Sequence, residues 1–178
     1  MRPITTRITI SSTPSISPET TYLRRRSDVN QMDVVASVEV PVSAEILFDY
    51  VADLANYSSW LEFVHKVESI SDSGNSDPTW MVELRAKLGV LARSKRLRMT
   101  RTIYEKPRVV VFERREQDSR RHAEWILRAI VSETADGAKL ETNLHYSGKL
   151  FTGTMLERAL TDQITAGRQR LIQLLSAK

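Results

Sequence analysis

The chain has 178 residues, of which 41% are hydrophobic, and this size predicts one domain that buries a core without covalent cross-links. It contains no cysteine, which excludes disulfides, thiolate metal sites and cysteine nucleophiles. The net charge is +4, but residues 1–31 hold five arginines and two acids and so account for +3 of it. The remaining chain is nearly neutral, which weakens the nucleic-acid interpretation that a basic protein invites.

Residues 1–31 form a segment of their own, rich in Ser, Thr, Pro and Arg and without any apolar period. Such a composition cannot bury enough surface to offset the entropy of ordering, so we predict a disordered tail before a domain at residues 32–178. Three roles stay open for it: a dispensable extension, an organelle transit peptide, or a basic arm in which Arg24, Arg25 and Arg26 anchor an anionic partner.

No apolar run approaches the ~20 residues that a membrane-spanning helix needs, and the N-terminus lacks the apolar core of a secretory signal. We therefore expect no transmembrane segment and a cytoplasmic location.

The domain opens with a strand at residues 34–40, where apolar and polar side chains alternate until Pro41 ends the pattern. Ser43 is placed to cap a short helix that runs to Val51. Asp53 is placed to cap a second helical turn, which precedes Trp60. Two short helices are thus predicted after the first strand.

Alternating segments then continue to residue 146 and predict about six further strands. They cover residues 63–71, 80–88, 96–103, 108–114, 123–131 and 140–146. Asp136 and Gly137 give the strongest hairpin signal in the chain, between the last two of these strands.

The chain closes with one long amphipathic helix at residues 153–175. Its apolar face holds Met155, Leu156, Ala159, Leu160, Ile164, Gly167, Leu171, Leu174 and Leu175. A single apolar helix that follows a continuous antiparallel sheet is expected to lie across the concave face of the sheet, where it encloses a pocket.

The stretch from residue 38 to residue 67 resembles the START-like superfamily, most of all its polyketide cyclase/dehydrase and coenzyme-Q-binding branch. The matching positions are Val40, Pro41, Ala44, Phe48, Val51, Asp53, Tyr57 and Trp60, with Leu171, Leu174 and Leu175 of the closing helix. The resemblance covers residues 33–176. It implies an α+β helix-grip fold, in which a curved antiparallel sheet of about seven strands wraps around a long C-terminal helix.

The same resemblance implies a cavity between sheet and helix, because members of this superfamily bind lipids, quinones, hormones or polyketides there. A minority act as cyclases or aromatases, and one branch is a ribosome-associated toxin. We therefore expect this chain to bind a hydrophobic small molecule such as a polyketide, quinone, isoprenoid or lipid, and possession of the fold alone does not choose among these functions.

Strand alternation predicts which side chains line that cavity, if each strand turns its apolar face inward. From the sheet these are Trp80, Val82, Leu84, Leu97, Met99, Arg101, Val111, Trp125, Leu127, Thr142, Leu144 and Tyr146. From the helix they are Leu156, Leu160, Ile164 and Leu171. Phe48, Val51, Tyr57 and Trp60 are expected to pack the short helices onto the sheet, and the alternative is that their aromatic members also line the mouth of the pocket.

An enzymatic alternative uses the polar members of this set. Arg101 would stabilise an enolate in a cyclase-type reaction, while Tyr146 or Glu113 would exchange a proton. The simpler alternative is that Arg101 reaches solvent or pairs with Glu113.

The sequence predicts no cofactor and no metal site, because all six glycines are isolated and the histidines are scattered. We expect His65, His122 and His145 at the surface.

A third alternative places basic side chains on the outer face of the sheet, as a patch for RNA, a ribosome or an anionic membrane. Its candidates are Lys95, Arg96, Arg98, Arg114, Arg115, Arg120 and Arg121. Acidic residues are interspersed and no aromatic is interleaved, which favours an ordinary solvated face. A nucleic-acid partner is therefore not expected, and a membrane-surface partner stays open.

Overall fold

The computed structural model describes residues 32–71, 77–88, 91–148 and 154–176, so the predicted tail lies outside the described residues. A seven-stranded antiparallel sheet has the strand order β1-β7-β6-β5-β4-β3-β2. The elements are β1 (Met32–Val40), α1 (Ala44–Val51), the 3₁₀ helix η1 (Leu54–Ser59), β2 (Val64–Ile70), β3 (Thr79–Leu88), β4 (Leu91–Glu105), β5 (Val109–Arg114), β6 (Trp125–Thr134), β7 (Gly137–Tyr146) and α2 (Thr154–Ser176). The predicted α+β helix-grip architecture is confirmed.

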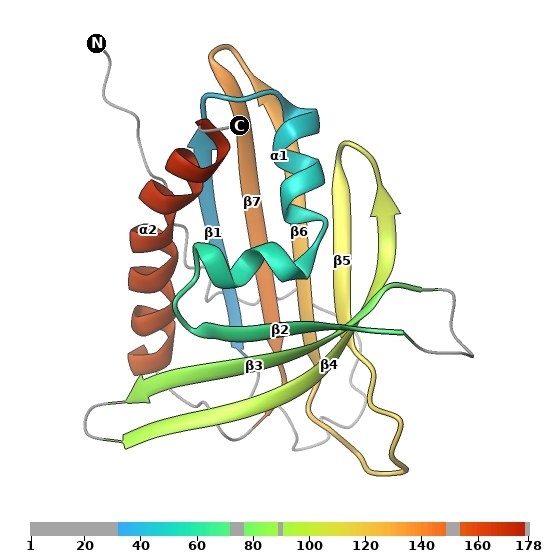
Figure 1. Cartoon of the computed structure of the whole chain (residues 1–178). Coiled ribbons are helices and arrows are strands. Elements are labelled where there is room, and N and C mark those ends of the chain that lie inside the picture. Colours follow the sequence, from blue (N-terminus) through green and yellow to red (C-terminus); the bar gives the residue numbers. More distant parts are fainter. Residues whose placement is uncertain (1–31, 72–76, 89–90, 149–153, 177–178) are drawn as a thin grey trace, which may run out of the picture.

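The sheet is strongly curved, and β2, β3 and β4 run crosswise to β1 and β7 in Figure 1. The strands β2 to β7 pair in chain order, and β1 then joins β7. The turn at Gly137 has a φ of +151°, and a Cβ there would collide with the carbonyl oxygen of Val40. Glycine is therefore required where the β6–β7 hairpin passes the end of β1.

Both predicted helix caps are present. The Ser43 hydroxyl accepts a hydrogen bond from the backbone N–H of Ile46 at 3.3 Å, at the start of α1. The Asp53 carboxylate accepts one from the N–H of Ala55 at 2.9 Å, at the start of η1. These caps fix where each short helix begins, as the sequence indicates.

The long helix α2 lies beside β1 and turns its buried face toward the core (Figure 1). Gly167 is buried against Trp60, and Leu171 and Leu175 are almost fully buried. The side chains of Leu156 and Leu160 lie outside the described residues. Among the helices of the described ranges, none is long and apolar enough to cross a membrane.

One strand faces the opposite way from the prediction. In β5 the side chain of Phe112 is fully buried and its ring contacts the rings of Tyr57 and Trp80, at centroid distances of 6.2 Å and 5.6 Å. Since side chains alternate along a strand, Val110 and Phe112 face the core, and Val111 and Glu113 face the other side of the sheet. The prediction that Val111 lines the cavity is therefore wrong.

Candidate functional site

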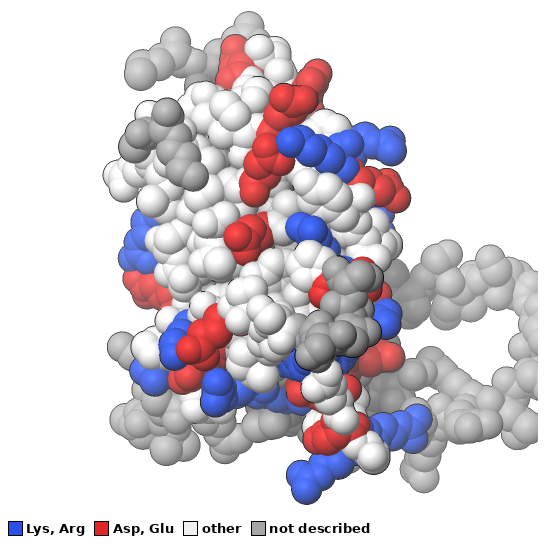
Figure 2. Space-filling model, turned by 45° about the vertical axis from the view of Figure 1, so that its right-hand side comes forward, with Lys and Arg blue, Asp and Glu red and all other residues white. Residues whose placement is uncertain are grey.

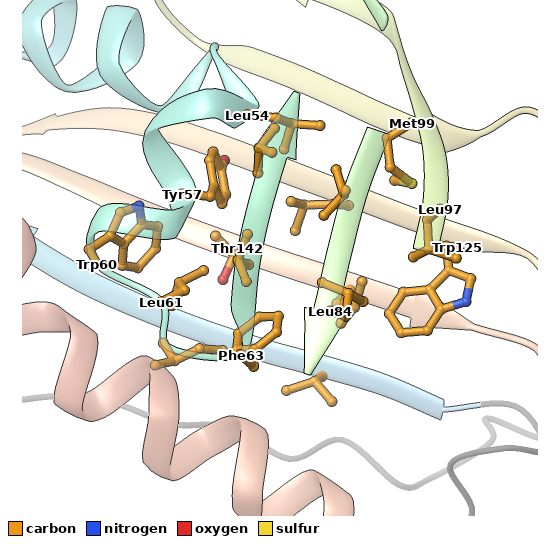
Figure 3. Close-up of a pocket in the computed structure, with 17 residues that line it drawn as sticks. Leu54, Tyr57, Trp60, Leu61, Phe63, Leu84, Leu97, Met99, Trp125 and Thr142 are labelled. Carbon is orange, nitrogen blue, oxygen red and sulfur yellow. The ribbon is translucent and has the colours of Figure 1, made fainter. Parts of the chain in front are cut away.

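An apolar cavity lies between the inner face of the sheet, the η1–β2 segment and α2 (Figure 3). Its volume is about 70 Å³, counted as room for the centre of a water-sized sphere. One water needs about 10–15 Å³ by the same measure, so the side chains leave space for a ligand fragment. Trp60 and Trp125 lie at opposite ends of the cavity in Figure 3.

Much of the predicted wall lines this cavity. The residues in question are Val82, Leu84, Leu97, Met99, Trp125, Leu127, Thr142, Leu144 and Ile164. Trp80, Tyr146 and Leu171 are instead buried in the core beside it. Alternation therefore identified the inner face correctly along β3, β6 and β7, and along β4 as far as Arg101.

A second group of lining residues was not predicted as the main cavity wall. For Tyr57 and Trp60 the sequence favoured packing and kept the pocket mouth as the alternative, and the other members were not singled out as lining. Its members are Val34, Leu54, Tyr57, Trp60, Leu61, Phe63, Val64 and Val67. Most come from η1 and from the connection to β2, where no period marks an inward face. The clustering of aromatic side chains between Tyr57 and Phe63 is the signal that identifies this wall.

The polar side chains in the lining are few and mostly engaged. The Tyr57 hydroxyl donates to the carbonyl oxygen of Val51 at 2.9 Å. The Thr142 hydroxyl donates to the carbonyl oxygen of Ala36 at 3.3 Å. The indole N–H of Trp60 is buried and has no hydrogen-bond partner among the described residues. The lining is thus apolar, with one buried donor at the Trp60 end.

Burial raises the pKa of the Tyr57 phenol well above its usual value of about 10. The unfolded chain ionises this phenol above pH 10 while the folded chain does not, so this one group lowers the stability by about 1.4 kcal/mol per pH unit there. We expect Tyr57→Phe to remove that part of the alkaline destabilisation. Urea unfolding at pH values from 7 to 11 measures it.

Tyr104→Phe is the matched control, because Tyr104 is 48% exposed. A Tyr57→Phe variant that loses stability above pH 10 as steeply as the wild type and the Tyr104→Phe variant would contradict this assignment.

The three catalytic candidates do not come together. Arg101 lies on the inner side, but its guanidinium donates to the carbonyl oxygen of Ala52 at 3.1 Å and its Cζ lies 4.2 Å from the Tyr104 ring centroid. Glu113 faces the other side of the sheet and accepts a hydrogen bond from Arg115 at 3.0 Å. The predicted alternative in which Arg101 pairs with Glu113 is therefore wrong, since each has another partner.

Tyr146 lies apart from both, fully buried, with its ring centroid 4.6 Å from that of Trp125. The Nζ of Lys95 lies 5.7 Å from the Tyr146 ring centroid and 5.9 Å from that of Trp125. A lysine and two aromatic rings thus meet at the Trp125 end of the cavity.

The predicted basic patch is divided between the two faces of the sheet. Lys95 is paired with Leu84 in the sheet and Arg114 with Met99, and both of these partners line the cavity, so the two cations face inward. Arg98 is 8% exposed and donates to the carbonyl oxygen of Arg115 at 2.8 Å.

Arg96, Arg120 and Arg121 are exposed, as is Arg115. On the face that Figure 2 shows, basic and acidic side chains lie next to one another and do not gather by sign. The idea of one continuous patch that includes Lys95, Arg98 and Arg114 is therefore wrong.

The histidines lie away from the cavity lining. His65 is exposed, and His145 Nδ1 lies 2.8 Å from an Asp33 carboxylate oxygen. His122 Nε2 lies 2.6 Å from an Asp118 oxygen, and this contact lowers the pKa of Asp118. Within the part of the chain that the structure describes, no cluster of three His, Asp or Glu side chains is arranged to hold a metal ion.

Known structures resemble this fold at low sequence identity. The di-domain ARO/CYC StfQ from the steffimycin biosynthetic pathway aligns with a TM-score of 0.56 and 12% identity, over 85% of this chain and 51% of that chain. This chain thus spans about half of that protein. The Zhui aromatase/cyclase from a Streptomyces species aligns with a TM-score of 0.59 and 13% identity, over 82% of this chain and 94% of that one.

A STAR-related lipid transfer protein from Xanthomonas axonopodis aligns with a TM-score of 0.59 and 13% identity, over 81% of this chain and 85% of that one. No curated protein sequence matches the chain significantly. The family model described as "polyketide cyclase / dehydrase and lipid transport" matches residues 31–176, which is 146 of the 178 residues. The chain therefore belongs to this family.

Proposed function

We propose that this protein binds a hydrophobic small molecule, of the polyketide, quinone, isoprenoid or lipid class, in the cavity between the sheet, η1 and α2. The observation that carries the proposal is the apolar lining, which includes side chains from β1 to β4, β6, β7, η1 and α2. Burial of apolar ligand surface against such a lining is favourable by about 25 cal/mol per Å².

The lining supports binding of a ligand more directly than catalysis of a reaction. Its two hydroxyl groups, on Tyr57 and Thr142, already donate to backbone carbonyl oxygens. The catalytic candidates Arg101 and Glu113 point elsewhere, toward Ala52 and Arg115. Side chains that surround a cavity lose packing contacts on that side, and an apolar ligand restores part of them.

The relatives agree with this class of ligand in general terms. The family description names both polyketide cyclases and lipid transport, and one structurally similar protein is called a STAR-related lipid transfer protein. Binding of a hydrophobic molecule, in the role of a carrier, is therefore the function that we propose for this chain.

A cavity-filling variant tests the proposal. We expect the wild type to bind N-phenyl-1-naphthylamine, an uncharged apolar fluorophore, with an increase in its emission. Leu127→Trp places a larger side chain in the lining and is expected to weaken binding by at least about tenfold, or 1.4 kcal/mol. Fluorescence titration measures both affinities.

Ile126→Trp is the matched control, because Ile126 is the neighbour of Leu127 on the opposite face of β6. It is expected to leave the affinity unchanged within about twofold, because its side chain points away from the cavity. If the wild type binds no fluorophore, or if both variants weaken binding equally, the proposed cavity is not the binding site.

Native mass spectrometry of the protein purified from its own host, followed by denaturing extraction, identifies the ligand itself. An apolar adduct at one per chain is the expected result.

A further inference from the structure

We infer that the bound hydrophobic molecule carries an acidic group, and that the ammonium of Lys95 holds this group at the Trp125 end of the cavity. This inference rests on the proposed function and deepens it, because it assigns a chemical class to the ligand. The class is an amphipathic acid, with an apolar body in the cavity and a carboxylate or phosphate at Lys95.

The first support is the position of Lys95 in the sheet. Lys95 is paired with Leu84 across the β3–β4 ladder, and it precedes Leu97 by two residues on β4. Both leucines line the cavity, and residues that are paired or two apart share a face of the sheet. Lys95 thus extends the cavity-lining row of β4 by one position.

The second support is where its ammonium group lies. The Nζ of Lys95 is 5.9 Å from the ring centroid of Trp125, which lines the cavity, and 5.7 Å from that of Tyr146. The two rings are themselves in contact, at 4.6 Å between centroids. A cation within about 6 Å of an aromatic face is attracted to it, so the rings hold the ammonium at the end of the cavity.

The third support is the local charge balance. Lys95 forms no ion pair among the described residues, while the nearest carboxylate that acts on it, Glu116, is paired with Arg114. Desolvation lowers the pKa of Lys95, the positive charge of Arg114 lowers it further, and Glu116 opposes this in part. A partly desolvated cation beside a second cation is stabilised by an added anion.

Arg114 already binds other groups of the protein, so we assign binding of the acidic group to Lys95 and not to Arg114. Its side chain is 8% exposed, and its Nε donates to Glu116 at 2.7 Å. Its other nitrogens lie 3.3 Å from the carbonyl oxygen of Ala123 and 3.1 Å from His122 Nδ1. Since Arg114 neutralises Glu116, the remaining positive charge at this end belongs to Lys95.

A pair of probes with one carbon scaffold tests the inference in the full-length protein. 8-Anilinonaphthalene-1-sulfonate carries an anionic group, and N-phenyl-1-naphthylamine is the same molecule without it. We expect Lys95→Gln to weaken binding of the sulfonate by about tenfold, the scale of one charge-assisted hydrogen bond, and to leave the neutral probe within about twofold. Lys95→Arg, which keeps the charge, is expected to retain most of the sulfonate affinity.

Lys66→Gln is the matched control, because Lys66 is an exposed lysine on β2 that pairs with Glu68. It is expected to change neither affinity. The inference is overturned if Lys95→Gln weakens both probes equally or neither of them, while the wild type still binds the neutral probe. If the wild type binds neither probe, the proposed function itself fails, which is a separate result.

Competition against the sulfonate probe distinguishes the acidic groups. Displacement by decanoate at lower concentration than by decyl phosphate indicates a carboxylate, and the reverse order indicates a phosphate. Displacement by decanol at the same concentration as by both acids overturns the requirement for an anion.

Discussion

Phe112→Ala is expected to lower the free energy of unfolding by about 3–5 kcal/mol, the range for a buried phenylalanine that is truncated in a core. Phe112 is fully buried, and its ring contacts those of Tyr57 and Trp80, so no neighbour replaces the lost contacts. A domain is typically stable by 5–15 kcal/mol, and this loss is therefore a large share of the total. Urea unfolding followed by circular dichroism measures it.

Ile46→Ala is the control for this experiment, because Ile46 is 49% exposed on α1. Its effect is expected to stay within about 0.5 kcal/mol. A Phe112→Ala variant that loses less than about 1 kcal/mol would contradict the placement of Phe112 on the inner face of β5, against η1.

Gly167→Leu is expected to destabilise the domain by about 3 kcal/mol or more, at the upper end of what overpacking costs. A Cβ at Gly167 would lie 3.2 Å from Cε3 of Trp60 and 3.3 Å from Cδ2 of Leu61, and nearer still to the Trp60 carbonyl oxygen. Because a backbone carbonyl does not rotate away like a side chain, α2 has to shift away from Trp60. Thermal unfolding measures the loss, and binding of the neutral fluorophore reports on the cavity.

Ala166→Leu is the matched control, since Ala166 is the preceding residue of α2 and is exposed. Leucine is a good helix former, so this variant is expected to lose less than about 0.5 kcal/mol. Equal losses at positions 166 and 167 would show that the helix has a different contact face.

The sequence predicts the order of elements and most strand faces because each signal is local. The caps at Ser43 and Asp53 need one side-chain oxygen at the right spacing, and both are observed. The period of two along β6 and β7 places Leu127, Thr142 and Leu144 in the cavity lining. Such a period predicts the inner face reliably because one face of each strand is buried and the other is not.

The prediction fails where the period is missing or tertiary contacts decide the face. In β5 four consecutive residues, 109–112, are apolar, so the sequence does not indicate which face of the strand points to the core. The contact of Phe112 with Tyr57 of η1 determines that face. In β4 the register shifts between Arg101 and Ile103, so Ile103 is 38% exposed although it shares parity with Leu97. Neither the contacts of Phe112 nor the register shift in β4 can be recognised from the local sequence pattern.

Lys95 illustrates a different limit. Its parity with Leu97 is readable in the sequence, yet its charge assigned it to a patch with Arg96 and Arg98 on the outer face. The structure keeps the parity and brings the ammonium to Trp125 and Tyr146, which are distant in sequence. A charge is costly to desolvate, and aromatic neighbours that reduce this cost become apparent only in three dimensions.

The pairing of β1 with β7 has a consequence for how the chain folds. The ladder runs from Met32 opposite Tyr146 to Val40 opposite Ala138, so it joins the first strand to the last. All other strand neighbours are consecutive along the chain and form through short loop closures. We therefore expect the first strand to dock after the meander of the other six has formed, and closure of this long loop to slow folding relative to a sheet of consecutive hairpins.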